Sequence, residues 1–333
     1  MPEGRVSSAV NLINTKSRRL FGFSLMVLTA LGLLAGNLFW GSHGLIWPFG
    51  HEAALERQIL AELRLPRVLA AFAAGGLLGL AGALVQVLTR NPLADPYILG
   101  ISGGAAVGAL LAILLGGTLL TQHLGAAVGA LAALALVMGL AHGEHAWTGH
   151  RLLLTGVVLA AALGAVVTLL LAIAPDTALR GMLFWLMGDL SVAPAPWIAL
   201  IGLAILGLLA MPMARNLNIL TRGELFAASL GVNVNTLRHL AYLGAAVATA
   251  LAVITAGTIG FVGLLAPHLA RLIMGADHRI VLPAAILLGG SLVMLADWVA
   301  RLVIAPQQLP AGAVLALIGA PIFLHLLHRS QRP

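Results

Sequence analysis

The sequence contains no cysteine and has little charge. The absence of cysteine from all 333 residues excludes disulfides, thiolate metal sites and cysteine nucleophiles. Charged residues make up 9% of the chain and hydrophobic residues 60%, and the mean hydropathy is +1.03. Soluble domains carry about a quarter charged residues. The composition therefore predicts that lipid, rather than water, surrounds most of this chain.

Catalytic and nucleotide-binding signatures are also missing. His51-Glu52 begins like the HExxH zinc motif, but Leu55 stands where the second histidine would be. No GxSxG elbow or cluster of paired carboxylates is present. The only lysine, Lys16, has no glycine run before it, as a phosphate-binding loop would require. We therefore predict no catalytic residue, no metal and no cofactor, and any ATPase must be a separate polypeptide.

Long apolar runs predict an all-α, polytopic membrane protein. A helix needs about 20 apolar residues to cross the hydrocarbon core, where its backbone groups must pair internally. Ten such spans are expected, near 20–40, 68–89, 98–116, 122–141, 152–174, 196–214, 238–256, 258–274, 280–304 and 309–328. Two uncharged stretches are too long for one span each, so we expect breaks at Gly116-Gly117-Thr118 and near Gly257.

Ten spans place both termini on one side of the membrane. The basic residues on that side would be Arg5, Lys16, Arg18, Arg19, Arg90, Arg151, Arg215, Arg222, Arg238, Arg271, Arg279, Arg329 and Arg332. The opposite side would hold Arg57, Arg64, Arg67, Arg180 and Arg301. The positive-inside rule then makes the first side cytoplasmic. The net charge of +7 is therefore attributed to topology and to contact with anionic membrane lipid, not to nucleic-acid binding.

No separate soluble domain is expected. Residues 1–333 are interpreted as one transmembrane domain, with a cytoplasmic tail at 1–19, a periplasmic segment at 41–67 and a cytoplasmic segment at 215–238. Helical periodicity predicts a short interfacial helix at 51–63 and one or two short helices at 218–232, ending near Gly231.

Small and ionisable residues inside the spans suggest further contacts. Glycines recur every three or four residues at 75, 79 and 82 and again at 100, 104 and 108, which predicts close helix packing. Asp297 and Arg301 lie one helical turn apart and are expected to pair. Arg301 also shares the outer side with Arg64 and Arg67. These arginines suit either an acidic partner or lipid headgroups, and the residues alone slightly favour headgroups.

Four longer motifs carry a more specific signal than any single glycine pattern. The first, LRLPRVLAAFAAGGLLGLAGALVQVLTRNPLADPYILGISGGAAVGA at 63–109, resembles the signature of the FecCD-type permeases, which import ferric siderophores, haem and cobalamin. The other three follow in the family's order: RGELFAASLGV at 222–232, AGTIGFVGLLAPHLARLIMGADHR at 256–279 and LPAGAVLALIGAPIF at 309–323. The resemblance covers nearly the whole chain.

This resemblance implies an inner-membrane subunit of ten helices, which works as a homodimer with two cytoplasmic ATP-binding subunits and one periplasmic binding protein. It implies that the binding protein docks at Arg64, Arg67 and Arg301, which reverses the preference for headgroups. The ATPase-coupling residues that it implies are Arg222, Gly223, Glu224, Ala227, Leu230, Gly231 and Val232, and its cytoplasmic gate region is Asn91, Pro92, Leu93 and Ala94. A second gate element before the fifth span matches poorly, because Gly149 stands where a hydroxyl residue is common.

The substrate implied by the resemblance is an iron chelate (siderophore or haem) or cobalamin. Similarity in 95–109 and 180–190 slightly favours cobalamin or a ferric siderophore over haem. The alternative function is a stand-alone secondary transporter or channel, which requires ion-coupling carboxylates at mid-membrane and inverted repeats. The nearest candidate carboxylate is Asp297, and Arg301 is placed to neutralise it.

Overall fold

The structure is a computed structural model that describes residues 3–41, 44–45, 54–141, 149–191 and 196–330. Its helices are α1 (Glu3–Phe39), α2 (Ala54–Gln58), the π-helix η1 (Ile59–Arg64), α3 (Leu65–Thr89), the 3₁₀-helix η2 (Pro96–Leu99), α4 (Ile101–Leu114), α5 (Leu119–Ala141), α6 (Gly149–Ile173), α7 (Asp176–Leu186), α8 (Pro196–Ala210), α9 (Ala214–Leu220), α10 (Glu224–Ser229), α11 (Val234–Ala256), α12 (Val262–Met274), α13 (His278–Leu302) and α14 (Ala311–Ser330). The short strands β1 (Trp40–Gly41) and β2 (Gly44–Leu45) pair antiparallel.

The described chain is all-helical apart from this two-stranded pair, as the sequence predicts. Within the described ranges, seven helical segments are long and apolar enough to cross a membrane, and three shorter apolar helices accompany them. Both expected breaks are confirmed: α4 ends at Leu114 before α5 begins at Leu119, and α11 ends at Ala256 before α12 begins at Val262.

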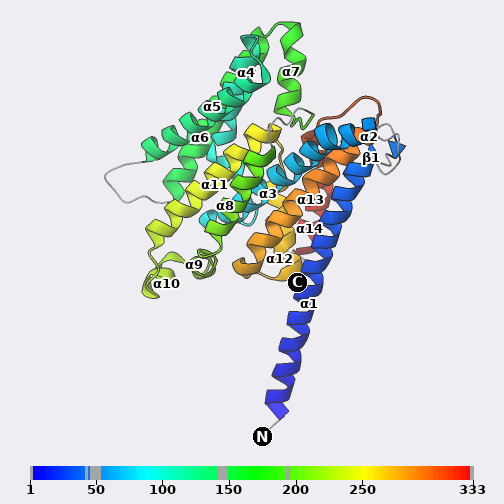
Figure 1. Ribbon diagram of the computed structural model, residues 1–333. Helices are drawn as coiled ribbons and strands as arrows, with labels where there is room; N and C mark the ends of the chain where they lie inside the picture. Colours follow the sequence, from blue (N-terminus) through cyan, green and yellow to red (C-terminus); the bar gives the residue numbers. More distant parts are fainter. Residues whose placement is uncertain (1–2, 42–43, 46–53, 142–148, 192–195, 331–333) are drawn as a thin grey trace.

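Helix α3 runs through the centre of the molecule (Figure 1), and most of its side chains from Val68 to Val87 are buried. It packs against α8, α11, α12 and α13. The outer faces of α5, α6 and α8 instead expose large aliphatic side chains, among them Val128, Leu169 and Leu208. Because these faces lie on helices of membrane-spanning length, they suit contact with lipid.

Glycines permit the closest helix contacts, as their spacing predicts. A Cβ atom on Gly82 of α3 would collide with the carbonyl oxygen of Gly263 in α12. On the other side of the molecule, Gly108 of α4 meets Gly125 of α5 backbone to backbone. Only glycine lets two helices approach this closely without displacing either backbone.

Three segments differ from or refine the sequence-based expectation. The helix expected at 51–63 is not separate, because α2, η1 and α3 run on as one helical segment from Ala54 to Thr89; His51 and Glu52 lie outside the described residues. Helix α7 was not expected, since its 11 residues are too few to span and carry a polar face. Helix α10 confirms a short helix within 218–232, whereas α9 begins earlier, at Ala214, where the sixth span was expected to end.

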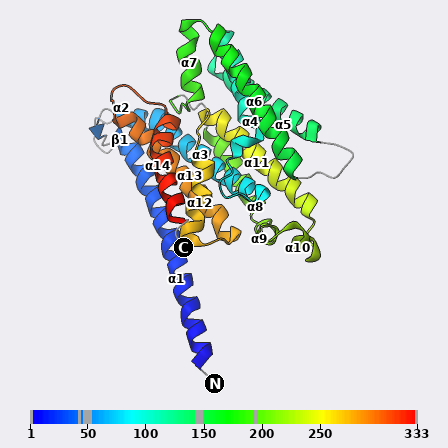
Figure 2. The ribbon, with the colours of Figure 1, turned by 180° about the vertical axis from the view of Figure 1, so that it is seen from behind.

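The connections sort to two opposite ends of the molecule. Helices α9 and α10 and both termini lie toward one end, whereas α2, β1 and α7 lie toward the other (Figures 1 and 2). We call the end with α9 and α10 the inner end and the opposite one the outer end. Arg222, which precedes α10, therefore lies at the inner end, and Arg64 and Arg67 of the LRLPR element lie at the outer end.

Candidate transport sites

The outer arginine cluster consists of Arg64, Arg67, Arg301 and Asp297, and it joins α3 to α13. Arg67 donates from Nε and Nη2 to the Asp297 carboxylate at 2.8–3.1 Å, and Arg301 Nε donates to the same group at 3.1 Å. Asp297 is fully buried. A buried carboxylate that faces two guanidinium groups is compensated, whereas an unpaired one would be strongly destabilising. The expected Asp297–Arg301 pair is thus confirmed, and Arg67 completes it.

The same cluster is tied to α1. Arg301 also donates to Asn37 Oδ1, and Arg64 Nη1 donates to the carbonyl oxygen of Leu38 at 2.7 Å. Arg64 and Arg301 are only 8% and 6% exposed, and the Arg67 side chain is the most accessible at 14%. The three arginines therefore form a packed network with little solvent access, rather than an open ring.

The segment expected to form the gate, Asn91–Ala94, follows Arg90, the residue that caps α3, and is named the gate segment for that expectation. Asn91 Oδ1 accepts from the Leu93 amide at 2.9 Å, and the Ala94 amide donates to the Asn91 carbonyl at 3.2 Å, so the segment is a tight turn. Asn91, Pro92 and Leu93 are exposed, whereas Ala94 is buried. Burial raises the pKa of Asp95, the next residue, although a bond from the Tyr97 amide opposes that shift.

A buried polar clamp holds the far end of the gate segment. Gln86 Nε2 of α3 donates to the Ala94 carbonyl at 3.2 Å and lies 3.4 Å from the carbonyl oxygens of Gly263 and Leu264 in α12. Arg271 of α12 donates to Gln86 Oε1. This clamp therefore fastens Ala94 to two helices at once.

The segment expected to couple to the ATPase, Arg222–Val232, is built around α10 and is named the coupling segment for that expectation. Gly223 and Gly231 flank the helix with positive φ angles of 120° and 79°, which glycine adopts without strain. Ala227 is buried, and its carbonyl accepts from the Val232 amide at 3.1 Å. These bonds make a compact projection at the inner end (Figure 1).

One face of this projection is exposed and apolar. Leu225 is 90% exposed and Leu230 56% exposed, while Phe226 beside them is 43% exposed. Arg222 is exposed as well, and Glu224 is partly covered. Exposed large apolar side chains on a short polar connection are typical of a protein contact.

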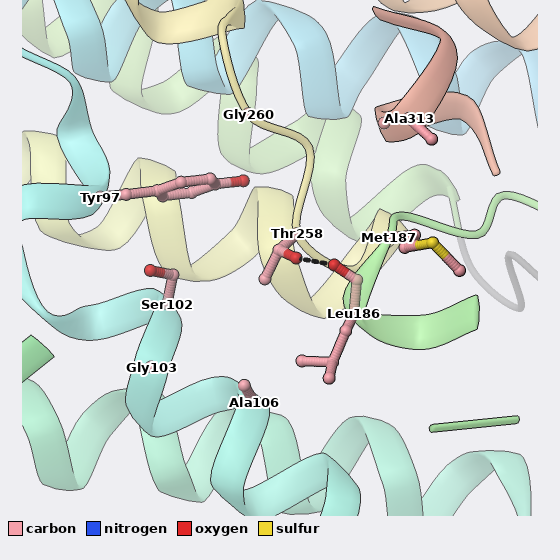
Figure 3. A pocket seen from close by; sticks show the side chains of 10 residues that line it. Tyr97, Ser102, Gly103, Ala106, Leu186, Met187, Thr258, Gly260 and Ala313 are labelled. Atoms are coloured by element: carbon pink, nitrogen blue, oxygen red, sulfur yellow. Dashed lines mark hydrogen bonds between the residues drawn. The ribbon is translucent and has the colours of Figure 1, made fainter. Parts of the chain in front are cut away.

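A cleft of about 470 Å³ lies between α4, the end of α7 and the start of α14 (Figure 3). It is lined by Tyr97, Ser102, Gly103, Ala106, Leu186, Met187, Thr258, Gly260, Gly312 and Ala313. None of these described lining residues is charged. The cleft therefore offers a neutral surface made mostly of small residues.

Hydroxyl groups at the cleft hold the connection between α11 and α12. Tyr97 Oη donates to the Ile259 carbonyl at 3.0 Å and accepts from the Ile259 amide at 2.7 Å. Thr258 donates to the Leu186 carbonyl, as the dashed line in Figure 3 shows. This connection is thus fixed from both sides of the cleft.

Sequence reasoning did not identify three of these polar residues, namely Gln86, Tyr97 and Arg271, as parts of a site. Gln86 carried a usable signal, because it is a lone amide in an otherwise apolar span, where polar side chains are costly unless they are bonded. The others show their roles only through partners that lie far away in the sequence.

Apolar spans, a neutral cleft between helices and a buried arginine cluster at the outer end together define a multi-pass α-helical membrane transport protein. The sequence model of the FecCD transport family matches residues 24–329. The chain therefore belongs to the FecCD transport family, and it is the membrane-spanning permease subunit of an ABC importer, not itself an enzyme.

Individual relatives agree with this assignment. The chain is 38% identical to the vitamin B12 import system permease protein BtuC of Vibrio vulnificus (strain CMCP6), over 92% of each chain. It is 39% identical to the hemin transport system permease protein HmuU of Yersinia pestis, over 94% of this chain and 96% of the other. A solved structure described as a metal-chelate type ABC transporter in an inward-facing conformation matches with a TM-score of 0.83 at 31% identity, covering 93% of this chain and 99% of that one. An importer permease of this kind requires ATPase and binding-protein partners.

Proposed function

We propose that this permease moves a metal–organic chelate, either an iron chelate (siderophore or haem) or cobalamin, and that it does so as a homodimer with two ATP-binding subunits and one periplasmic binding protein. The observation that carries the proposal is the similarity, over more than nine tenths of the chain, to permeases named for vitamin B12 and for hemin. Both of those cargoes are large organic ligands around one metal ion, so the shared property is the class of substrate.

The neutral cleft supports this substrate class. A metal chelate presents mostly organic surface, which needs room and weak contacts rather than a fixed counter-charge. We propose that the cleft lines part of the translocation path and that a second copy of the chain completes that path. Substrate affinity then resides in the binding protein, which delivers the chelate.

The proposed topology has ten spans, with both termini in the cytoplasm. Support comes from the seven long and three shorter apolar helices of the described chain. Further support is the position of both termini at the inner end with α9 and α10 (Figure 1). The whole chain is then one permease domain, in which 1–19 is a cytoplasmic tail, 41–67 is periplasmic and 215–238 is cytoplasmic.

Each end of the permease then has one protein partner. At the outer end, Arg64, Arg67 and Arg301 exceed the single carboxylate of Asp297, so the cluster keeps a positive charge that attracts acidic side chains of the binding protein. At the inner end, the exposed apolar face around Leu225 is the proposed contact with the ATPase. The gate segment, which follows Arg90 at the inner end of α3, is proposed to close the path on the cytoplasmic side.

The test is reconstitution of the permease with its ATPase in proteoliposomes that also receive the loaded binding protein. ATP-dependent uptake of cyanocobalamin, haemin and ferric dicitrate would be compared, with Leu225→Asp as the variant that should lose ATPase binding. Accumulation of one of these chelates that requires ATP and is lost in Leu225→Asp is expected. Uptake that proceeds without any ATPase, or uptake of none of the three, would contradict the proposal.

A further inference from the structure

Glu224, the first residue of α10, is held by two arginines of its own chain. Arg90 Nη2 lies 3.4 Å from Glu224 Oε1, and Arg238 Nη2 of α11 contacts the same oxygen. The Arg238 side chain is 16% exposed, against 38% for Glu224 and 54% for Arg90. The carboxylate therefore joins a well-covered arginine to a more exposed one.

Arg90 stands between α3 and the gate segment. It ends α3 in a left-handed conformation with φ of 49°, which is uncommon for a residue other than glycine. Its amide donates to the Val87 carbonyl at 3.2 Å, and the chain then turns directly into Asn91. A displacement of the Arg90 side chain thus acts on the first residue of the gate segment.

The other end of the gate segment is fixed by the Gln86 clamp. Pro267 explains why that clamp is needed: an α-helical amide at position 267 would bond the Gly263 carbonyl, and proline has no N–H to give. Gln86 Nε2 lies 3.4 Å from this freed carbonyl and also binds Ala94. The Ala94 end of the segment is therefore bound by a side chain that also contacts α12. The Asn91 end is held to α3 through its amide, which donates to the Gln86 carbonyl at 3.2 Å, and it is joined to the coupling segment through Arg90.

From this arrangement we infer that α10 moves the gate segment through the Arg90–Glu224 ion pair. Arg238 keeps the Glu224 carboxylate in position for that contact. The inference rests on the proposed function, in which α10 meets the ATPase. Leu225 and its apolar neighbours contact the ATPase, and Glu224 faces inward to the permease. A shift of α10 then pulls Arg90 while the Gln86 clamp keeps Ala94 in place, so the turn opens or closes.

The natural absence of cysteine makes this testable with a single introduced thiol. Leu93, which is 40% exposed, is replaced by cysteine, and its labelling rate by a membrane-impermeant maleimide is measured in the ATPase complex with and without ATP. Arg90→Gln, Glu224→Gln and the double variant are compared in this background. Arg215→Gln is the matched control, since it removes an exposed arginine from α9 at the same end.

ATP is expected to change the labelling of Leu93→Cys in the otherwise native chain and in Arg215→Gln. Each ion-pair variant should reduce that change by about three- to fivefold, as expected for loss of a partly exposed ion pair. The double variant should be no worse than the worse single variant, because the two residues act through one contact. Full responses in all three variants, or effects that multiply in the double variant, would overturn the inference.

A second measurement separates this inference from the proposed function. Binding of the ATPase is measured for Leu225→Asp and for Glu224→Gln. If Leu225→Asp binds normally, the proposed coupling contact is wrong. If Leu225→Asp loses ATPase binding, the proposed coupling contact stands. If Glu224→Gln then binds the ATPase, hydrolyses ATP and shows the native change in labelling, the ion-pair inference fails. If ATP does not alter labelling in the native background, the gate assignment fails and the inference with it.

Discussion

The guanidinium group of Arg67 binds the carboxylate of Asp297 through two nitrogens, Nε and Nη2, although 230 residues separate them in the chain. This contact fastens the outer end of α3 to α13 in the buried part of the molecule. Arg301 lies one turn from Asp297 on the same helix, α13, and donates to the same carboxylate. Asp297 is therefore the carboxylate that both arginines contact.

Replacement of Asp297 should consequently destabilise the fold. Asp297→Asn keeps the shape of the side chain but leaves Arg67 and Arg301 without a counter-charge, which costs about 3–5 kcal/mol for a broken buried pair. Denaturant unfolding in detergent measures the loss. Asp176→Asn, at the exposed start of α7, is the control and should change little. Equal stability of the two variants would show that the cluster is not a structural network.

The accessibility of the arginines predicts unequal roles in docking the binding protein. Arg67 has the most exposed side chain of the cluster, so Arg67→Gln should weaken binding-protein affinity about tenfold and reduce its salt dependence. Surface plasmon resonance at two salt concentrations measures both effects. Arg57→Gln removes an exposed arginine of α2 at the same end and serves as the control. An equal loss in Arg57→Gln would indicate general attraction rather than docking at the cluster.

Hydropathy and turn residues allowed most of the helices to be predicted from the sequence. The spans are set by local composition, and the breaks at Gly116 and Gly257 fall where both glycines take positive φ. Helix α7 was missed because it is short and amphipathic, so neither span length nor uniform hydropathy marks it. Residues 64–67 were expected to separate the helix at 51–63 from the span at 68–89, but η1 and the first turn of α3 continue the helix through them. Proline is tolerated in the first turn of a helix, and Pro66 has that position in α3.

Side-chain partners were predictable only where they are local. The Asp297–Arg301 pair follows from a spacing of four residues on one helix, and the structure confirms it. The contacts of Arg90 with Glu224 and of Gln86 with Arg271 join residues 134 and 185 positions apart. Such pairings depend on how the helices pack, which a single sequence does not encode in any local pattern.

The helix contacts at glycine predict which small residues tolerate a methyl group. Gly82→Ala should cost about 1–3 kcal/mol, since the new Cβ would collide with the Gly263 backbone and force α3 and α12 apart. Gly164→Ala in α6 is the matched control, because nothing lies within 4 Å of its Cβ position. That control should gain about 0.5–1 kcal/mol from the better helix propensity of alanine. Unfolding curves that rank the two variants in the opposite order would rule out this packing of α3.

The Gln86 clamp predicts an interaction between two substitutions on different helices. Gln86→Leu leaves the Ala94 and Gly263 carbonyls without their side-chain donor, which should cost about 1–3 kcal/mol. Pro267→Ala restores a backbone amide that can reach the Gly263 carbonyl within α12. In that background Gln86→Leu should therefore cost less, and a double-mutant cycle of unfolding free energies measures the difference.

Pro283→Ala in α13 provides the control for that cycle. It also restores an amide inside a helix, but Gln86 donates to no carbonyl of α13 among the bonds of the described residues. The cost of Gln86→Leu should be unchanged by Pro283→Ala and lowered by about 0.5 kcal/mol or more by Pro267→Ala, the range found for directly coupled sites. Equal coupling with both prolines would mean that Gln86 does not act on the carbonyl freed by Pro267, and the fixed end of the gate segment would then depend on the Ala94 bond alone.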